Sequence, residues 1–483
     1  MSSPKVLFTS PVQPIGGCSP NVYSWDKSST SIRVAMSFLN HPGLAFLKEN
    51  LPCDVLEYPD QEMFTKALDP APDILGISFY INETEIAIRM AKEARAAGVK
   101  EIWAGNFGAY SPNIAPFFDR IFTGWSEHQI AEALGLPNTS ANEIKHPEIY
   151  GGFGSNLMPR MFLSGLLFTS RGCPWTCNFC QTPGFYGKSK PVPMEAIDKI
   201  LWTYHRRGIS GINILDENFG TFKNHAREVV DLLHKYKMRW IALTRVDTLL
   251  RDFDYWHSRG LFGAHLGIES LNQSSLDGGS KRISQLDSVR LLKRMSRYNM
   301  FVQAFYILGF ESDTIQSIRN DINLLASLDI DVVQTQILTP YPKTEQAEMI
   351  NERYGISDTN MSKYNSRNLV WQHPNIKHDE MREIQQWANT RLTSSRRALR
   401  TLSKLVLFHG SRYPGINGLK VIAKSYFGEN KAVYKSLANN IKSAHSWAKK
   451  GWFAYEEFPS SEAVTTQLAS NYRPRAVAPN LST

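Results

Sequence analysis

The 483-residue sequence contains no apolar run of about 18 residues, the length that a membrane-spanning helix needs. Its first residues, MSSPKVLFTS, lack the basic region and apolar stretch of a secretory signal. The chain has only five cysteines, an odd number, which argues against a disulfide framework and favours a reducing compartment. These absences predict a cytoplasmic protein. What is present, 42% hydrophobic and 20% charged residues, is typical of a globular chain long enough for several domains.

The net charge of +9 is concentrated in one region. Residues 391–450 contain thirteen Lys or Arg and a single acidic residue, Glu429. Because this local excess is larger than the charge of the whole chain, the rest of the sequence is slightly acidic. The positive charge therefore belongs to one C-terminal region and must be explained there.

The first 140 residues alternate strand-like and helix-like segments. Short apolar runs that end in turn residues predict strands, and 83–98 has the apolar spacing of a helix and ends in glycine. The predicted strands are 5–11, 53–59, 73–80, 101–106 and 120–125. Strands separated by helices indicate a parallel sheet, so we expect a doubly wound, Rossmann-like α/β domain over 1–140.

The remaining chain divides into four segments. Residues 141–160 are rich in Gly, Pro, Asn and Ser, which predicts a linker. From 161 to 374 six strand-helix units follow one another, which predicts a partial (β/α)6 barrel with its reacting groups at the carboxyl ends of the strands. Residues 375–455 show helical patterns only, and 456–483 resemble a disordered tail.

Three cysteines, Cys173, Cys177 and Cys180, lie in the loop TSRGCPWTCNFCQTPGFYG that follows the first predicted barrel strand. A structural zinc site would need four protein ligands, and no second Cys-x2-Cys pair or nearby pair of histidines is present. A [4Fe–4S] cluster has four irons, so three cysteine ligands leave one iron open to a substrate or cofactor. The spacing therefore favours a reactive cluster.

The arrangement Cys-x3-Cys-x-Phe-Cys, with Phe179 before the last cysteine, resembles the signature of the radical S-adenosylmethionine (SAM) superfamily. The resemblance implies that the open iron chelates SAM and that Phe179 is one of the residues that bind SAM. It also implies that an external electron donor of the flavodoxin or ferredoxin type drives the cleavage of SAM to a 5′-deoxyadenosyl radical. A chance cluster of cysteines is the simpler alternative. The sequence assigns no catalytic residue that acts on the substrate.

Other strand ends match positions of this family that bind SAM. The resemblance assigns Asp216 and Glu217 to the SAM amino group, although a carboxylate pair capping the next turn is the alternative. It assigns Arg245 to the SAM carboxylate, which a guanidinium can bind at two points; a surface salt bridge is the alternative. Glu269 in GIES is expected near the methionine or ribose, and Gly309 in YILGFESDT is expected to let the backbone approach the adenine.

The order of the domains resembles the cobalamin-binding branch of this superfamily, over residues 5–370. The resemblance implies that cobalamin lies across the carboxyl edge of the first sheet, near Gly76, Ser78, Gly105 and Gly124. The segment after the first strand lacks the histidine that coordinates cobalt in many cobalamin domains. A Rossmann-like domain that serves architecture or substrate binding is therefore the alternative.

Together these features predict a cobalamin-dependent radical SAM methyltransferase that acts on an unactivated carbon of a lipid or small natural product. The alternatives are radical cyclisation, oxidation or coupling without methyl transfer, or a non-catalytic iron–sulfur protein. The basic region 391–450 suggests peripheral contact with anionic lipid, while a solvated face is the simpler reading. Because no RNA-binding motif is recognisable, we do not expect a nucleic-acid partner.

Overall fold

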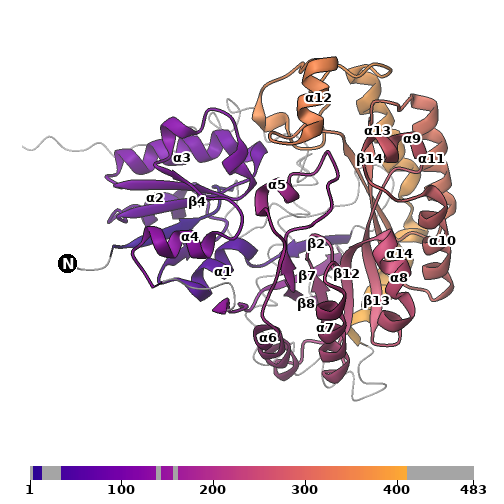
Figure 1. Ribbon diagram of the computed structural model, residues 1–483, viewed down its shortest axis with the longest axis horizontal. Coiled ribbons are helices and arrows are strands. Elements are labelled where there is room, and N and C mark those ends of the chain that lie inside the picture. The colour runs from indigo at the N-terminus through magenta and orange to yellow at the C-terminus, as the bar shows by residue number, and fades with distance from the viewer. Residues whose placement is uncertain (1–3, 14–33, 138–142, 156–161, 411–483) are drawn as a thin grey trace, which may run out of the picture.

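The computed structural model describes residues 4–13, 34–137, 143–155 and 162–410. Its strands form a five-stranded sheet, an eight-stranded sheet and a small two-stranded ribbon. Figure 1 shows the N-terminal sheet with its helices on one side of the molecule and the larger, curled sheet with its helices on the other. Helix α5 (Thr182–Tyr186), which follows the cysteine loop, lies between them.

The N-terminal sheet is parallel throughout and has the order β3-β1-β4-β5-β6. Helices cover both faces of this sheet, and the central strands β1 and β4 are buried along most of their length. Helices α2 and α3 pack on one face, and α1 and α4 pack on the other. The elements are β1 (Val6–Thr9), β3 (Asp54–Leu56), β4 (Ile74–Ser78), β5 (Glu101–Gly105), β6 (Arg120–Ile121), α1 (Pro42–Asn50), α2 (Gln61–Ala67), α3 (Thr84–Ala96) and α4 (Ser126–Ala133). The expected doubly wound arrangement is confirmed.

The larger sheet contains six consecutive parallel strands, which confirms the partial barrel. They are β8 (Phe162–Leu167), β11 (Gly211–Ile214), β12 (Arg239–Arg245), β13 (Leu261–Glu269), β14 (Phe301–Leu308) and β15 (Val332–Ile337). Helices follow these strands and bury their apolar sides against the sheet: α6 (Met194–Arg206), α7 (Lys223–Lys235), α8 (Val246–His257), α10 (Gln285–Arg297) and α11 (Ile315–Ser327). The carboxyl ends of the strands therefore meet at one edge.

Two antiparallel strands extend this sheet beyond the six that were expected. β7 (Tyr150–Ser155) pairs with β8, and β2 (Val34–Phe38) pairs with β7. The predicted linker 141–160 thus includes a strand, and a segment of the predicted first domain joins the barrel sheet. The sequence of β7, YGGFGS, is half glycine, so it lacks the side-chain alternation by which a strand is recognised.

Two C-terminal helices, α13 (His378–Leu392) and α14 (Ser395–Gly410), pack against the barrel. Apolar residues of α14, including Phe408, contact Ile241 and Phe301 near the amino ends of their strands, so α14 covers the barrel end opposite to the cysteine loop. Lys404 of α14 is fully buried, and its Nζ lies 2.9 Å from a carboxylate oxygen of Asp331. Part of the predicted basic region therefore serves internal packing, while 411–450 and the predicted tail 456–483 lie outside the described residues.

Candidate active site

The cysteine loop begins where β8 ends, at the carboxyl edge of the barrel. A ribbon of β9 (Ser170–Arg171) and β10 (Lys190–Pro191) frames it. Burial, with a smaller contribution from the neighbouring Cys180 and Cys177, raises the pKa of the Cys173 thiol to about 11. The three thiols therefore lie near one another, and positively charged iron would favour their ionised form.

The donor set of this loop fits an iron–sulfur cluster better than a single ion. Within the described part of the chain, no group of three or more His, Cys, Asp or Glu side chains is arranged to hold one metal ion. A zinc site would draw four such groups around one point. Three cysteines on a single loop fit a [4Fe–4S] cluster with one iron that has no protein ligand.

Two carboxylates at the end of β11 hold this loop in place. Asp216, 1% exposed, accepts hydrogen bonds from the Thr169 N–H at 2.6 Å, the Thr169 hydroxyl at 2.5 Å and the Ser170 hydroxyl at 2.8 Å. Glu217 accepts a bond of 2.9 Å from the Gly172 N–H, directly before the first cysteine. Burial raises the pKa of Glu217 to about 7. These groups, predicted to bind the SAM amino group, are in the structure anchors of the cysteine loop.

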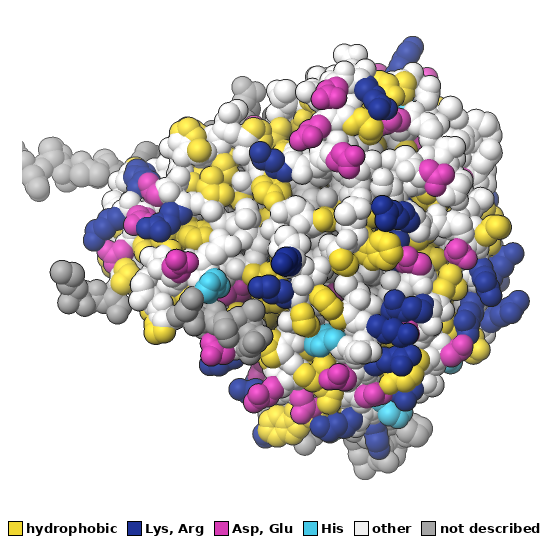
Figure 2. Space-filling model, in the orientation of Figure 1, with side chains coloured by type: hydrophobic (Ala, Val, Ile, Leu, Met, Phe, Trp, Pro, Cys, Tyr) yellow, Lys and Arg dark blue, Asp and Glu magenta, His cyan; other side chains and the backbone are white. Residues whose placement is uncertain are grey.

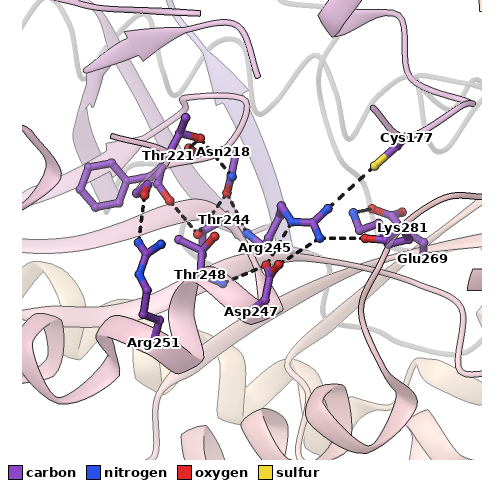
Figure 3. A network of polar contacts seen from close by, with 12 residues as sticks. Cys177, Asn218, Thr221, Thr244, Arg245, Asp247, Thr248, Arg251, Glu269 and Lys281 are labelled. Atoms are coloured by element: carbon purple, nitrogen blue, oxygen red, sulfur yellow. Dashed lines mark hydrogen bonds and ion pairs between the residues drawn. The ribbon is translucent and has the colours of Figure 1, made fainter. Parts of the chain in front are cut away.

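Arg245 lies at the end of β12 and is the centre of the polar network in Figure 3. Its Nε and Nη2 atoms donate to the two carboxylate oxygens of Asp247, at 3.0 and 3.1 Å. Nη2 also donates to the Lys281 carbonyl at 2.7 Å, and Nη1 lies 3.8 Å from the Cys177 sulfur. The structure thus brings Arg245 to the cysteine loop, as expected for a site residue, but with most of its donors engaged.

A cavity of about 360 Å³ opens between the cysteine loop and the last strands of the barrel. Phe179 and Glu269, both predicted SAM-binding residues, line it together with Cys180. Glu269 forms a buried ion pair of 2.7 Å with Lys281, and its φ of 62° is unusual for a residue with a side chain. We call this the barrel cavity.

Gly309 lines neither the barrel cavity nor the second cavity, at the edge of the N-terminal sheet, that is described below. Its φ is +85°, and a Cβ atom there would lie 2.6 Å from the Met381 Cε of α13. The need for glycine at this position is therefore explained by backbone conformation and by packing against a helix. The predicted role of its backbone beside adenine is not tested by this contact.

A second cavity, of about 320 Å³, lies at the carboxyl edge of the N-terminal sheet, and we call it the sheet-edge cavity. All four residues predicted to face cobalamin, Gly76, Ser78, Gly105 and Gly124, line it. A Cβ atom on Gly105 would meet nothing within 4 Å, so this glycine faces open space. Gly124 has a φ of +70° and approaches the Phe185 carbonyl, which excludes a side chain. The edge therefore has the bare backbone surface that a large flat ligand needs.

Several residues of the sheet-edge cavity were not predicted. The Arg171 guanidinium lies 4.0 Å from the Phe46 ring and 4.5 Å from the Trp125 ring, and it pairs with the buried Glu127 at 2.6 Å. Trp125 and Glu127 follow within three residues of Gly124, which was predicted to face cobalamin, and Arg171 is two residues before the first cysteine. Their positions close to Gly124 and Cys173 were the only hint in the sequence that these residues belong to the site. The sequence could not show that Arg171 and Glu127 form an ion pair.

The two cavities share two aromatic residues. Tyr80 and Phe107 line both, and their rings stack with centroids 6.4 Å apart and planes 16° apart. Phe107 also contacts Phe185 of α5, with ring centroids 4.4 Å apart. This aromatic pair forms a common wall between the sheet-edge cavity and the barrel cavity.

His146 packs against Phe46 and Phe168, two residues that line the sheet-edge cavity, and gives a pH-dependent prediction. Its Nε2 accepts from the Phe168 N–H and its Nδ1 donates to the Pro147 carbonyl, so the ring is neutral. Burial lowers its pKa from 6.5 to about 3. As the pH falls below 6.5, this histidine is protonated in the unfolded chain while it stays neutral in the folded protein. The free energy of unfolding therefore decreases by about 1.4 kcal/mol for each pH unit between 6.5 and about 3.

We expect urea unfolding at pH 7.5 and pH 5.0 to show this loss, and His146→Gln to lose about 2 kcal/mol less than the wild type between the two pH values. The comparison uses the change with pH within each protein, so a general destabilisation by the substitution does not affect it. Equal losses in both proteins would contradict the assignment of a neutral, buried His146.

Comparison with known proteins places the cysteine loop and barrel in a family. The Radical SAM superfamily model matches residues 167–325. An uncharacterized methyltransferase of Pyrococcus horikoshii is 29% identical over 37% of this chain and 40% of its own length. The bacteriochlorophyllide d C-8(2)-methyltransferase of Chlorobaculum tepidum is 25% identical over 62% of this chain and 72% of its own length.

The first curated relatives match the chain over about two fifths of their own length. A solved structure extends the likeness to the N-terminal sheet: the radical SAM methyltransferase TsrM of Kitasatospora setae, with cobalamin and a [4Fe–4S] cluster bound. It aligns with a TM-score of 0.58 at 14% identity, over 92% of this chain and 100% of that one. At this identity the match shows a shared fold. Residues 167–325 therefore match the radical SAM superfamily, and the chain shares the fold of this cobalamin-bound methyltransferase structure.

Proposed function

We propose that this protein is a cobalamin-dependent radical SAM methyltransferase that methylates an unactivated carbon. One observation carries the proposal: the cavity beside the three cysteines and the cavity at the glycine-lined sheet edge share a wall, made of Tyr80 and Phe107. A reaction that uses a radical from one cofactor and a methyl group from another needs both at one substrate. Two adjacent cavities, each matched to one cofactor, meet that need.

The residues that would hold the two cofactors lie on separate elements. Cys173, Cys177 and Cys180 would hold a [4Fe–4S] cluster, with SAM in the barrel cavity beside Phe179 and Glu269. Gly105 and Ser78 at the sheet edge would face cobalamin. When bound, the cluster supplies the electron that cleaves SAM, and cobalamin supplies the methyl group. The chain's own contribution is to orient both and to exclude water.

The lining of the barrel cavity supports an apolar or amphipathic small molecule as substrate. Phe305, Ile307 and Leu338 provide apolar surface, and Gln336 and Ser366 provide a few polar groups. This combination is typical of sites that bind mainly apolar ligands and orient them by a few hydrogen bonds. A lipid or small natural product fits the lining, and a flavodoxin or ferredoxin type of donor would supply the electron.

Contact with a membrane surface through residues 391–450 stays a prediction, as does the cytoplasmic location. Arg400 and Lys404 of the described part form ion pairs with Asp331. On the face drawn in Figure 2, basic and acidic side chains are interspersed. In the described residues, no helix combines the length and apolar character needed to cross a bilayer.

Product analysis tests the proposed function. The protein, purified without oxygen and supplied with a reductant and SAM, is given extracts fractionated by polarity. A methyltransferase of this type forms both 5′-deoxyadenosine and S-adenosylhomocysteine when a fraction contains its substrate. Formation of 5′-deoxyadenosine alone would instead indicate radical chemistry without methyl transfer. Formation of neither product would contradict both catalytic readings.

The shared aromatic wall leads to a prediction that needs no substrate. Replacing Phe107 by alanine removes a ring that lines both cavities and would join the barrel cavity to the sheet-edge cavity, which weakens the exclusion of water from the site. We expect Phe107→Ala to raise unproductive 5′-deoxyadenosine formation from SAM several-fold. Phe117→Ala is the matched control, because Phe117 packs on the far helix layer and lines neither of these cavities. Equal rates for the wild type and both variants would show that this wall does not protect the site.

A further inference from the structure

We propose that Arg245 is a positioning residue for the iron–sulfur cluster: it holds the cysteine loop and raises the reduction potential of the cluster through Cys177. The proposal rests on the proposed function, because it requires that the three cysteines bind a cluster. It differs from the role that the family resemblance assigns to Arg245, which is to bind the carboxylate of SAM. Figure 3 shows the arrangement from which it is argued.

On one side, Arg245 contacts the cysteine loop at two points. Its Nη1 lies 3.8 Å from the Cys177 sulfur, within reach of an N–H···S hydrogen bond. Its Cζ lies 4.0 Å from the ring of Trp175, close enough for a cation–π contact. Trp175 and Cys177 are two residues apart on the loop, so a single guanidinium fixes both the tip of the loop and one ligand.

On the other side, Arg245 is tied to three elements of the barrel. Asp247 at the start of α8 binds it at two points, and the Lys281 carbonyl accepts a third bond. The backbone N–H of Arg245 donates to the Asn218 side chain, which follows β11, at 3.1 Å. The Arg245 side chain is only 6% exposed. These ties give the guanidinium one fixed orientation, with Nη1 directed at the loop.

The number of donors decides between the two roles. A guanidinium has five N–H groups. Two bonds to Asp247, one to Lys281 and one to Cys177 use four of them, which leaves one. Two-point binding of the SAM carboxylate needs two parallel N–H groups. Arg245 can provide that only if it gives up a partner it already has.

The position of the charge predicts its effect on the cluster. Asp247 binds the Nε and Nη2 edge, so the N–H that faces Cys177 lies on the part of the guanidinium away from the carboxylate. Hydrogen bonds to the cysteine sulfurs and nearby charge are among the factors that set the potential of such clusters. Reduction adds negative charge, which a cationic donor stabilises. Arg245 therefore makes the cluster easier to reduce.

The test is a redox titration of the cluster in the holoprotein without SAM, followed by electron paramagnetic resonance, together with a measurement of SAM binding. In Arg245→Gln we expect the ratio of reduced to oxidised cluster at a fixed potential to fall about tenfold, a shift of 59 mV for one electron. We expect the dissociation constant of SAM to change less than twofold. Arg251→Gln is the matched control, because Arg251 on α8 bonds to Gly220 and Asp252 and does not touch the loop.

Arg245→Lys separates charge from geometry, because lysine keeps the charge but cannot bind at several points. We expect it to keep the potential close to that of the wild type and to release iron to a chelator faster than Arg251→Gln does. If Arg245→Gln does not retain the cluster and its potential cannot be measured, the rate of iron release from Arg245→Lys tests the proposal. Release no faster than from Arg251→Gln would then contradict it. An unchanged potential with strongly weakened SAM binding would overturn the proposal in favour of the carboxylate role. Absence of a cluster from the wild type would instead contradict the proposed function.

Discussion

Replacing Cys177 by alanine is expected to abolish the cleavage of SAM. The three cysteines lie on one loop, and within the described residues no group of three or more His, Cys, Asp or Glu is arranged to hold a single metal ion. Loss of one thiolate would leave two ligands for a cluster of four irons, and the iron that must remain open would no longer be defined. The measurement is 5′-deoxyadenosine formed per chain, with iron content determined on the same sample.

Cys53→Ala is the matched control for this experiment. Cys53 is a half-buried thiol at the edge of the N-terminal core, and burial raises its pKa to about 11. Cys53 packs against the N-terminal core and lies outside the cysteine loop, so it is not one of the expected cluster ligands. We expect this variant to keep the iron content and the SAM cleavage of the wild type. Normal SAM cleavage by Cys177→Ala would refute the cluster assignment.

Replacing Gly105 by phenylalanine is expected to prevent cobalamin binding and methyl transfer while leaving SAM cleavage intact. The Cβ position of Gly105 meets no atom within 4 Å and lies at the sheet-edge cavity, so a benzyl group is expected to extend into the cavity and occupy space that cobalamin would need. The cysteines lie in the barrel part of the chain and do not line this cavity. Cobalamin retained by the protein, measured by corrin absorption, and 5′-deoxyadenosine formation separate the two effects.

Gly105→Ala is the graded control. Gly105 does not have a positive φ, so alanine is compatible with the backbone, and a methyl group meets no atom within 4 Å. We expect this variant to retain cobalamin. Equal cobalamin content in the phenylalanine variant and the wild type would show that the ligand does not lie against this strand end.

Much of the fold could be predicted from sequence because short apolar runs and helical periods are local. The strands at 5–11 and 73–80, for example, correspond to β1 and β4. β2 and β7 were not predicted, because they pair with each other across about 115 residues of sequence and because β7 is rich in glycine. A strand of this kind is specified by its neighbours in the sheet, which local pattern does not report.

The candidate site shows a similar division. The sequence placed Asp216 and Arg245 correctly at strand ends but could not show their partners in the cysteine loop, which lie 46 to 68 residues away. Gly309 was predicted to let the backbone approach the adenine, and the sequence could not also show that the atom nearest to its Cβ position belongs to Met381, on a helix 72 residues further along the chain. The type of a residue and its position at a strand end can be read from the local sequence. The partner of a buried polar group cannot, because it depends on how distant segments pack together.

The most direct test of the central claim is the absorption spectrum of protein purified without oxygen from cells supplied with cobalamin, with iron and corrin determined on the same sample. The proposed function predicts an iron–sulfur shoulder together with corrin bands, about four iron atoms per chain and one corrin. An iron–sulfur shoulder without corrin, in protein that cleaves SAM, would contradict the role given to the sheet-edge cavity. Protein with neither chromophore would contradict the account as a whole.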